Sequence, residues 1–172
     1  MERGYLKGLF SGDGYCYHDI KSGHFAVEFF LHSEKDKKIQ EYLIFILRKL
    51  ELNPIIYKDK RYHCNRIRIY SKQFYEFINK NVRMSNKEFK VGFISGIIDA
   101  EGNVSHKKSH IIVVNTNKEL LARAKAYLSK LDINSTLTIK KCFNQRWSKL
   151  YVLNISYEYI NIKSNSLKVG NS

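Results

Sequence analysis

The chain of 172 residues contains 30 lysine or arginine residues against 16 aspartate or glutamate residues, which gives a formal net charge of +14. This excess indicates a polyanionic partner, and nucleic acid fits better than an acidic membrane surface because the basic residues fall in strand-like segments and not along one amphipathic helix. With no apolar run of the roughly 20 residues needed to span a bilayer and no secretory signal, we expect a cytoplasmic, nucleoid-associated protein without a membrane partner.

The first part of the chain predicts a helix, a hairpin, a helix, a hairpin and a helix. A capping-box pattern, SEKD, marks the start of the second helix, and Asn53-Pro54 ends it. In chain order the predicted elements are the helix with GLFSGDG (8–14), the hairpin YCYHDIKSGHFAVEFFL (15–31), the helix opened by SEKD (33–36), a hairpin over 55–71 and a helix over 72–80.

The second part of the chain repeats this order. Its elements are a helix opened by SNKE (85–88) and carrying GIIDAEG (96–102), a hairpin over 103–115, a helix opened by TNKE (116–119) and a hairpin over 136–156, with a further helix at the end. We therefore expect an α+β protein built as αββαββα twice, with halves 1–82 and 83–172. Nothing between the halves is rich in glycine or serine, so they should pack together and not be flexibly tethered.

Small residues recur at every fourth position in the two helices with the quoted motifs. The second set lies 88 positions after the first: Gly4, Gly8 and Gly12, then Gly92, Gly96 and Ala100. Glycine inside a helix costs about 1 kcal/mol relative to alanine, so such stripes need a reason. Close approach of two helix backbones supplies one. We expect the two helices to pack together about a pseudo-two-fold axis and to form the interface between the halves.

An acid follows the last small residue of each stripe, Asp13 in the first and Glu101 in the second. Parallel pairing of the helices would bring both carboxylates to one end, where they repel each other unless a cation lies between them. Oxygen ligands favour Mg²⁺, which can activate water beside a phosphodiester. One such acid alone would more simply be a solvated helix-end residue, but identical positions in two stripes favour a site.

The stretches LKGLFSGDG (6–14) and ISGIIDAEG (94–102) resemble the paired motifs of the LAGLIDADG homing endonucleases, in the single-chain type with two motifs that is common in archaeal introns and inteins. The resemblance covers residues 4–157. It implies saddle-shaped antiparallel sheets that bind double-stranded DNA, and a monomer that cleaves both strands of a long, asymmetric site to leave short 3′ overhangs. It implies Mg²⁺ as cofactor, with Mn²⁺ able to substitute and Ca²⁺ supporting binding without cleavage.

The resemblance also assigns residues. It makes Asp13 and Glu101 the metal ligands, joined by the backbone carbonyls of Gly12 and Ala100. The position two residues before each acid is usually acidic in the family, but it is serine in the first motif. We take it as structural.

A second departure from the family concerns the end of the second strand of each half. Family members usually carry lysine or glutamine there, near the scissile phosphates. The matching residues here are His32 and Asn115. We expect His32 to donate a hydrogen bond or relay a proton, and Asn115 to orient water.

Strand alternation separates the residues expected to face DNA from those that face the helices. His24, Glu28, Arg66 and Arg68 should face outward. Outward arginine suits bidentate contact with guanine, and glutamate can accept from cytosine. Tyr15, Tyr17 and Tyr57 can add base or sugar contacts. Basic residues at hairpin tips and flanks suit phosphates: Lys21, Lys58, Lys60, Arg61, Lys107, Lys108, Lys140, Lys141, Arg146 and Lys149.

Two other functions fit the same fold. One is a splicing maturase that binds intron RNA, and the other is a DNA-binding protein that does not cleave. The two acids argue against a loss of cleavage, and we find no appended helix-turn-helix domain. The length favours a free-standing, intron-encoded enzyme, because inteins carry splicing segments in addition.

Overall fold

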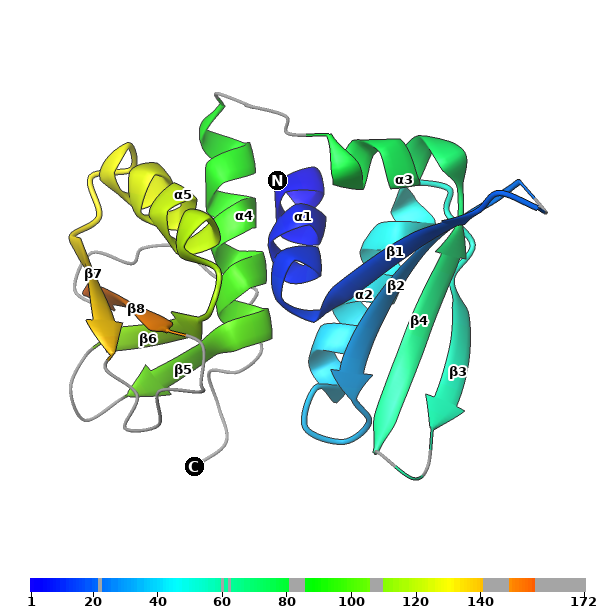
Figure 1. Ribbon diagram of the computed structural model, residues 1–172, viewed down its shortest axis with the longest axis horizontal. Helices are drawn as coiled ribbons and strands as arrows, with labels where there is room; N and C mark the ends of the chain where they lie inside the picture. The colour runs from blue at the N-terminus through cyan, green and yellow to red at the C-terminus, as the bar shows by residue number, and fades with distance from the viewer. Residues whose placement is uncertain are drawn as a thin grey trace. The chain divides into compact units, whose positions relative to one another are not determined.

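The computed structural model describes residues 1–21, 23–59, 61, 63–80, 86–105, 110–140 and 149–156 (Figure 1). By their contacts these residues form two compact units. One contains Asp13–Met84, and the other combines Met1–Gly12 with the described part of Ser85–Ser172. These units differ from the expected halves in the first helix, which is grouped with the second part of the chain. None of the described helices is long and apolar enough to cross a membrane.

The unit formed by Asp13–Met84 is one antiparallel sheet with two helices. Its strands lie in the order β1-β2-β4-β3. The elements are β1 (Gly14–Asp19), β2 (His24–His32), α2 (Lys37–Lys49), β3 (Ile55–Asp59), β4 (Cys64–Tyr70) and α3 (Lys72–Asn79). Val27, Phe29 and Ile67 are fully buried and share one face, as the strand period of two requires. The helix α2 lies behind the sheet in Figure 1.

The other unit has the same plan around a second antiparallel sheet, with strand order β5-β6-β8-β7. Its elements are α1 (Glu2–Asp13, of which Asp13 is counted with the other unit), α4 (Lys87–Glu101), β5 (Gly102–Ser105), β6 (His110–Asn115), α5 (Lys118–Ser129), β7 (Ser135–Lys140) and β8 (Leu150–Ser156). The two sheets and the element order confirm the α+β class and the duplicated plan. The expected final helix falls outside the described residues.

Helices begin later than the capping boxes predict. The predicted cap at Ser33 is wrong, because residues 33–36 form a turn and α2 begins at Lys37. In the second part of the chain the capping side chains are asparagines. Asn86 accepts a hydrogen bond from the N–H of Phe89 at 2.9 Å, and Asn117 accepts one from the N–H of Leu120 at 3.0 Å. Asn86 and Asn117 both use the preferred N-cap geometry. Each is one residue after the cap that was predicted, Ser85 or Thr116.

The backbones of α1 and α4 touch, and the two helices lie side by side (Figure 1). A Cβ atom on Gly8 would collide with the carbonyl oxygen of Phe93, and one on Gly96 with the carbonyl oxygen of Tyr5. The close approach recurs along both helices, at Gly4 against Phe89, Gly8 against Phe93, and Gly12 against Ala100. Because both series rise together, the helices run parallel and their C-terminal ends meet.

A buried hydrogen bond adds to this helix contact. The hydroxyl of Tyr5 on α1 donates to Oδ2 of Asp99 on α4 at 2.8 Å. Both side chains are almost fully buried, at 3% and 2% exposure. A carboxylate so placed stabilises the helix pair through a charge-assisted hydrogen bond and is not available to solvent.

Candidate functional site

The C-terminal end of α4 carries a carboxylate that a neighbouring amide orients. Nδ2 of Asn115 donates to Oε1 of Glu101 at 2.9 Å. Oδ1 of the same amide accepts the N–H of Asn117 at 2.7 Å, which fixes the direction of the amide because a backbone N–H can only donate. Asn115 therefore faces Glu101 with its donor edge and positions the carboxylate.

The C-terminal end of α1 lies against this same carboxylate. A Cβ atom on Gly12 would lie 2.9 Å from Cγ and 3.4 Å from Oε1 of Glu101. Any side chain at position 12 would thus fill the space in front of the acid. Asp13 is the next residue along the chain and ends the helix.

Around Asp13 the other unit gathers titratable side chains at one end of its sheet. Burial, followed by the carboxylates of Asp59 and Asp13, raises the pKa of the Cys64 thiol above its ordinary value. His32 lies directly opposite Cys64 in the pairing of β2 with β4. Within the described ranges no three histidine, cysteine, aspartate or glutamate side chains form a ready metal cluster.

The ring of His32 is fixed by its own turn. Nδ1 accepts the N–H groups of Glu34 and Lys35, each at 3.2 Å. The neutral ring therefore carries its hydrogen on Nε2 and offers a donor there. The ring also stacks on that of His63, with centroids 6.2 Å apart. His32 and Asn115 are used alike, and each is the last residue of a strand. The acceptor atom of each side chain bonds to backbone N–H groups of the following turn, and the donor N–H group points elsewhere.

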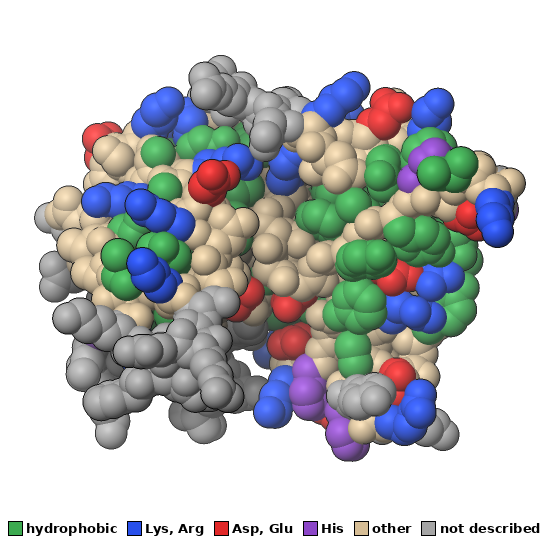
Figure 2. Space-filling view, viewed as in Figure 1, with side chains coloured by type: hydrophobic (Ala, Val, Ile, Leu, Met, Phe, Trp, Pro, Cys, Tyr) green, Lys and Arg blue, Asp and Glu red, His purple; other side chains and the backbone are tan. Residues whose placement is uncertain are grey.

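The face of the β1-β2-β4-β3 sheet opposite α2 carries aromatic rings around charged groups. Strand pairing aligns Tyr15, Glu28 and Arg68 in one row. Figure 2 shows this face as largely hydrophobic in colour, with basic and acidic atoms in its middle. We call it the tyrosine–arginine face, and its members are Tyr15, Tyr17, Glu28, Phe30, Tyr57, Arg66, Arg68 and Tyr70.

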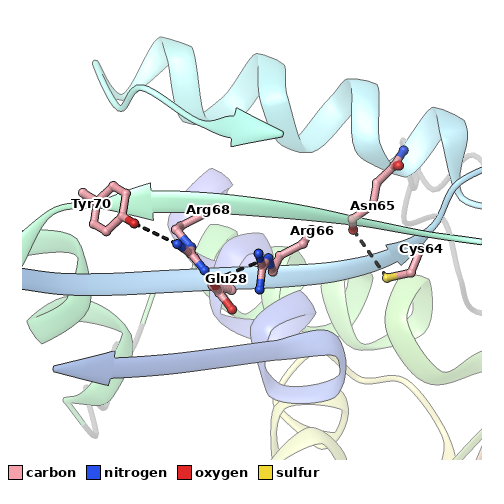
Figure 3. Close-up of polar contacts among 6 residues, drawn as sticks. All are labelled: Glu28, Cys64, Asn65, Arg66, Arg68 and Tyr70. Atoms are coloured by element: carbon pink, nitrogen blue, oxygen red, sulfur yellow. Dashed lines mark hydrogen bonds and ion pairs between the residues drawn. The ribbon is translucent and has the colours of Figure 1, made fainter. Parts of the chain in front are cut away.

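Glu28 lies on the outward face as predicted, but it is buried there, with 3% exposure, so the expectation that it offers an accessible carboxylate is wrong. Its neighbours explain the burial (Figure 3). Nε of Arg68 donates to Oε1 of Glu28, and Nη1 of Arg68 donates to the Tyr70 hydroxyl at 2.8 Å. Nε of Arg66 lies 3.9 Å from the same carboxylate oxygen. Burial lowers the pKa of Arg68, but the hydrogen bonds to Tyr70 and Glu28 outweigh burial and raise this pKa above its ordinary value.

The other residues predicted for DNA contact lie in several places. Exposed side chains are His24 at the start of β2, Lys21 and Arg61 in the turns of the two hairpins, and Lys140 and Lys149 at β7 and β8. Lys58 lies opposite Asn65, whose amide bonds to Gln40 of α2, so Lys58 is on the helix side of its sheet and not on the tyrosine–arginine face. Lys60, Lys107, Lys108, Lys141 and Arg146 fall outside the described residues.

Phe30, Tyr70 and the contact of Asn115 with Glu101 are not among the sequence predictions. Tyr70 continues the alternation of Arg66 and Arg68 along β4, and Phe30 continues that of Glu28 along β2, so the strand period was the available signal. The contact of Asn115 with Glu101 joins residues 14 positions apart, and no local pattern marks it.

Comparison with known proteins places this geometry in a family. A family model described as LAGLIDADG-like domain matches residues 1–82 and 88–165. The chain belongs to this LAGLIDADG family. Its relatives include the MJ0398 protein of Methanocaldococcus jannaschii, 33% identical over 149 residues. That match covers 81% of this chain and 52% of the relative, so the chain spans about half the length of that protein.

Another LAGLIDADG relative is the homing endonuclease I-DmoI of Desulfurococcus mucosus. It is 29% identical over 163 residues, which cover 88% of this chain and 79% of that protein. The structure of I-DmoI in complex with DNA and Mn matches 99% of this chain and 98% of its own, with a TM-score of 0.70 and 26% identity. I-DmoI has also been solved in complex with DNA and Ca, at a TM-score of 0.69.

Proposed function

We propose that the chain is a homing endonuclease that makes a staggered double-strand break in a long, asymmetric DNA site with the help of divalent metal. The observation that carries this proposal is the parallel packing of α1 and α4 with Gly12 directly against Glu101. The acid at position 13 follows Gly12 by one peptide unit, about 3.8 Å between Cα atoms. Two carboxylates at the ends of paired helices suit a cation-binding site beside a phosphodiester.

In this proposal the halves 1–82 and 83–172 each contribute one acid and one DNA-binding sheet. A single chain then supplies the acids for cleavage of both DNA strands and acts as a monomer. A second copy would duplicate acids that the chain already carries twice.

The donors at the helix ends fit a hard divalent cation. Asp13 and Glu101 would hold it together with the backbone carbonyls of Gly12 and Ala100, all oxygen ligands of the kind that Mg²⁺ prefers. The absent side chain at Gly12 leaves room in front of the Glu101 carboxylate. Bound Mg²⁺ supplies charge neutralisation and an acidified water. Mn²⁺ should substitute, and Ca²⁺ should support binding alone.

His32 and Asn115 serve this site in different ways. His32 presents the N–H of Nε2 and would donate it to a phosphate oxygen, because its Nδ1 is occupied by two backbone groups. Asn115 acts as a positioning residue that holds Glu101 through its Nδ2 donor. Neither role needs the lysine that other family members carry.

DNA would be held mainly through charge. Exposed Lys21, Arg61, Lys140 and Lys149 are placed to contact phosphates, and we propose the same for the predicted basic residues outside the described ranges. Tyr17 and His24 would contact bases or sugars. The tyrosine–arginine face would read sequence from the first half.

A cleavage selection tests the proposed function. The purified full chain is incubated with Mg²⁺ and a plasmid library that carries long randomised duplex inserts, and the ends of linearised molecules are sequenced. We expect a small set of related inserts, cut at a fixed stagger with 3′ overhangs. A protein that linearises no insert in Mg²⁺ or Mn²⁺ is not an endonuclease of this kind.

A further inference from the structure

The two arginines of the tyrosine–arginine face are held differently, although both lie on β4 and point the same way. The side chain of Arg68 is 16% exposed and that of Arg66 is 39% exposed. Only Arg68 makes a hydrogen bond to the buried carboxylate of Glu28. Their sequence context, alternate positions in NRIRIY, gives no reason for this difference.

Arg68 is enclosed on several sides. Glu28 and the Tyr70 hydroxyl take its Nε and Nη1 groups. The guanidinium carbon lies 4.9 Å from the ring centroid of Tyr57, 5.8 Å from that of Tyr17 and 5.7 Å from that of Tyr70. A guanidinium so engaged has a fixed orientation and few donors left for a base.

Among the described residues, the guanidinium of Arg66 makes an ion pair with Glu28 but no hydrogen bond. Its Nε lies 3.9 Å from the Glu28 carboxylate, beyond hydrogen-bond distance. One face of its guanidinium rests on the Tyr57 ring at 5.0 Å. Strand pairing places it between Phe30 and Tyr57, so two rings flank the exposed fork. A planar fork held against a ring and open at its edge suits bidentate bonding to the O6 and N7 acceptors of guanine.

From these contacts we infer that Glu28 locks Arg68 as a positioning residue, and that Arg66 is the guanidinium on this face that reads a guanine of the DNA site. The guanine contact of Arg66 rests on the proposed function, which supplies the DNA partner. The pairing of Glu28 with Arg68 does not depend on that function. The charges agree with this division between the two arginines. Glu28 is hydrogen-bonded to Arg68 and makes only a longer ion pair, at 3.9 Å, with Arg66, so the three groups keep a net charge of +1 and Arg66 is the more exposed guanidinium.

A double-mutant cycle tests the lock without any DNA. Urea unfolding midpoints are measured for Glu28→Gln, Arg68→Gln and Arg66→Gln, and for Glu28→Gln combined with each arginine change. We expect Glu28→Gln and Arg68→Gln to be strongly non-additive, because either change alone removes one side of the hydrogen-bonded ion pair and leaves the other side without its hydrogen-bond partner. Glu28→Gln and Arg66→Gln should be close to additive. Coupling to Arg66 as strong as that to Arg68 would overturn the inference.

A binding selection tests whether Arg66 contacts a guanine of the DNA site. Wild type, Arg66→Gln and the double variant Glu28→Gln/Arg68→Gln select from a pool of randomised duplexes in Ca²⁺, and the enriched sequences are compared. The double variant is the matched control, since Arg68→Gln alone would leave Glu28 free to capture Arg66. We expect Arg66→Gln to reduce the preference for guanine at one or two positions about tenfold or more. The control should keep that preference.

The opposite pattern, with guanine preference lost in the control and kept in Arg66→Gln, would overturn the assignment of Arg66 to the guanine contact. If wild type enriches no duplex, the proposed function fails, and so does the assignment of Arg66 to a guanine of the DNA site. The unfolding cycle then still decides the lock, because its outcome does not depend on DNA.

Discussion

The imidazole of His32 has one nitrogen that is already committed to the backbone. Its Nδ1 accepts two N–H groups at 3.2 Å, so the other nitrogen of the neutral ring is a donor and not a base. Asn115 at the end of β6 uses its amide in the same sense, with the acceptor on the next turn and the donor on Glu101. Both strand ends therefore present an N–H group, which is the feature they share with lysine and glutamine.

Substitution of His32 distinguishes a donor from a proton relay. We expect His32→Gln to keep most of the cleavage rate, because glutamine retains an N–H near the position of Nε2. His32→Ala should lower the rate about 100-fold, the usual effect of losing one preorganised donor. Single-turnover cleavage measures the rates. Nitrogen-15 chemical shifts of the ring report the tautomer without substrate, and a hydrogen on Nδ1 of the neutral ring would contradict the assignment.

The hydrogen bond between Tyr5 and Asp99 is a second residue whose effect can be measured. Tyr5→Phe removes the donor to a carboxylate that is 2% exposed. We expect the free energy of unfolding to fall by about 1.5–3 kcal/mol, the range for a hydrogen bond to a charged group. Tyr15→Phe is the control, since Tyr15 is 55% exposed, and it should change stability by less than about 0.5 kcal/mol. Equal effects in urea unfolding would argue against the buried bond.

Among the elements, the contact of α1 with α4 depends on the absence of side chains. In an exposed helix, Gly8→Ala would stabilise by about 1 kcal/mol. Here the new Cβ would meet the backbone oxygen of Phe93, which cannot rotate away, so the helices must move apart. We expect the free energy of unfolding to fall by about 1–3 kcal/mol, as overpacking does in other cores. Urea or thermal unfolding checks the sign.

The control for this prediction is Ala122→Gly at an exposed position of α5. It should lower the free energy of unfolding by about 1 kcal/mol through helix propensity alone. Two losses from opposite substitutions, alanine to glycine on α5 and glycine to alanine on α1, would identify packing as the cause at position 8. A Gly8→Ala protein more stable than wild type would show that the backbones are not in contact.

For the whole molecule, the net charge of +14 predicts strongly salt-dependent DNA binding. We expect affinity to fall about 1000-fold or more between about 50 mM and 200 mM salt. Lys21→Gln should reduce the slope of log affinity against log salt by about 1. Lys38→Gln on α2, exposed on the other side of the sheet, has the same change in net charge and should leave the slope unchanged. Equal changes from both variants would mean that binding does not depend on the position of the charge.

Much of the architecture could be predicted because its signals are local. The alternation of strands, the capping boxes at the starts of α4 and α5 and the repeated motif together predict the element order and the α+β class. Exact helix starts were missed, since the turn at 33–36 is held by contacts of Asp36 with the backbone of His32. Such contacts do not appear in a capping pattern.

The candidate site was harder to predict, because its details depend on residues distant in sequence. Alternation placed Glu28 on the outer face correctly but could not indicate its burial, which results from Arg68, 40 positions away. The same limit applies to Lys58, whose side of the sheet follows from pairing with β4. Strand register sets both, and register depends on the whole sheet.

Cleavage by variants of Asp13 and Glu101 tests the proposed metal site most directly. A duplex enriched by the wild-type protein is incubated with wild type, Asp13→Asn or Glu101→Gln, in Mg²⁺ and in Ca²⁺. We predict a staggered double-strand cut by wild type in Mg²⁺ only, no double-strand cut by either variant, and binding in Ca²⁺ by all three. Full double-strand cleavage by Asp13→Asn or Glu101→Gln would contradict the proposed function, because the paired acids would then not be the metal ligands.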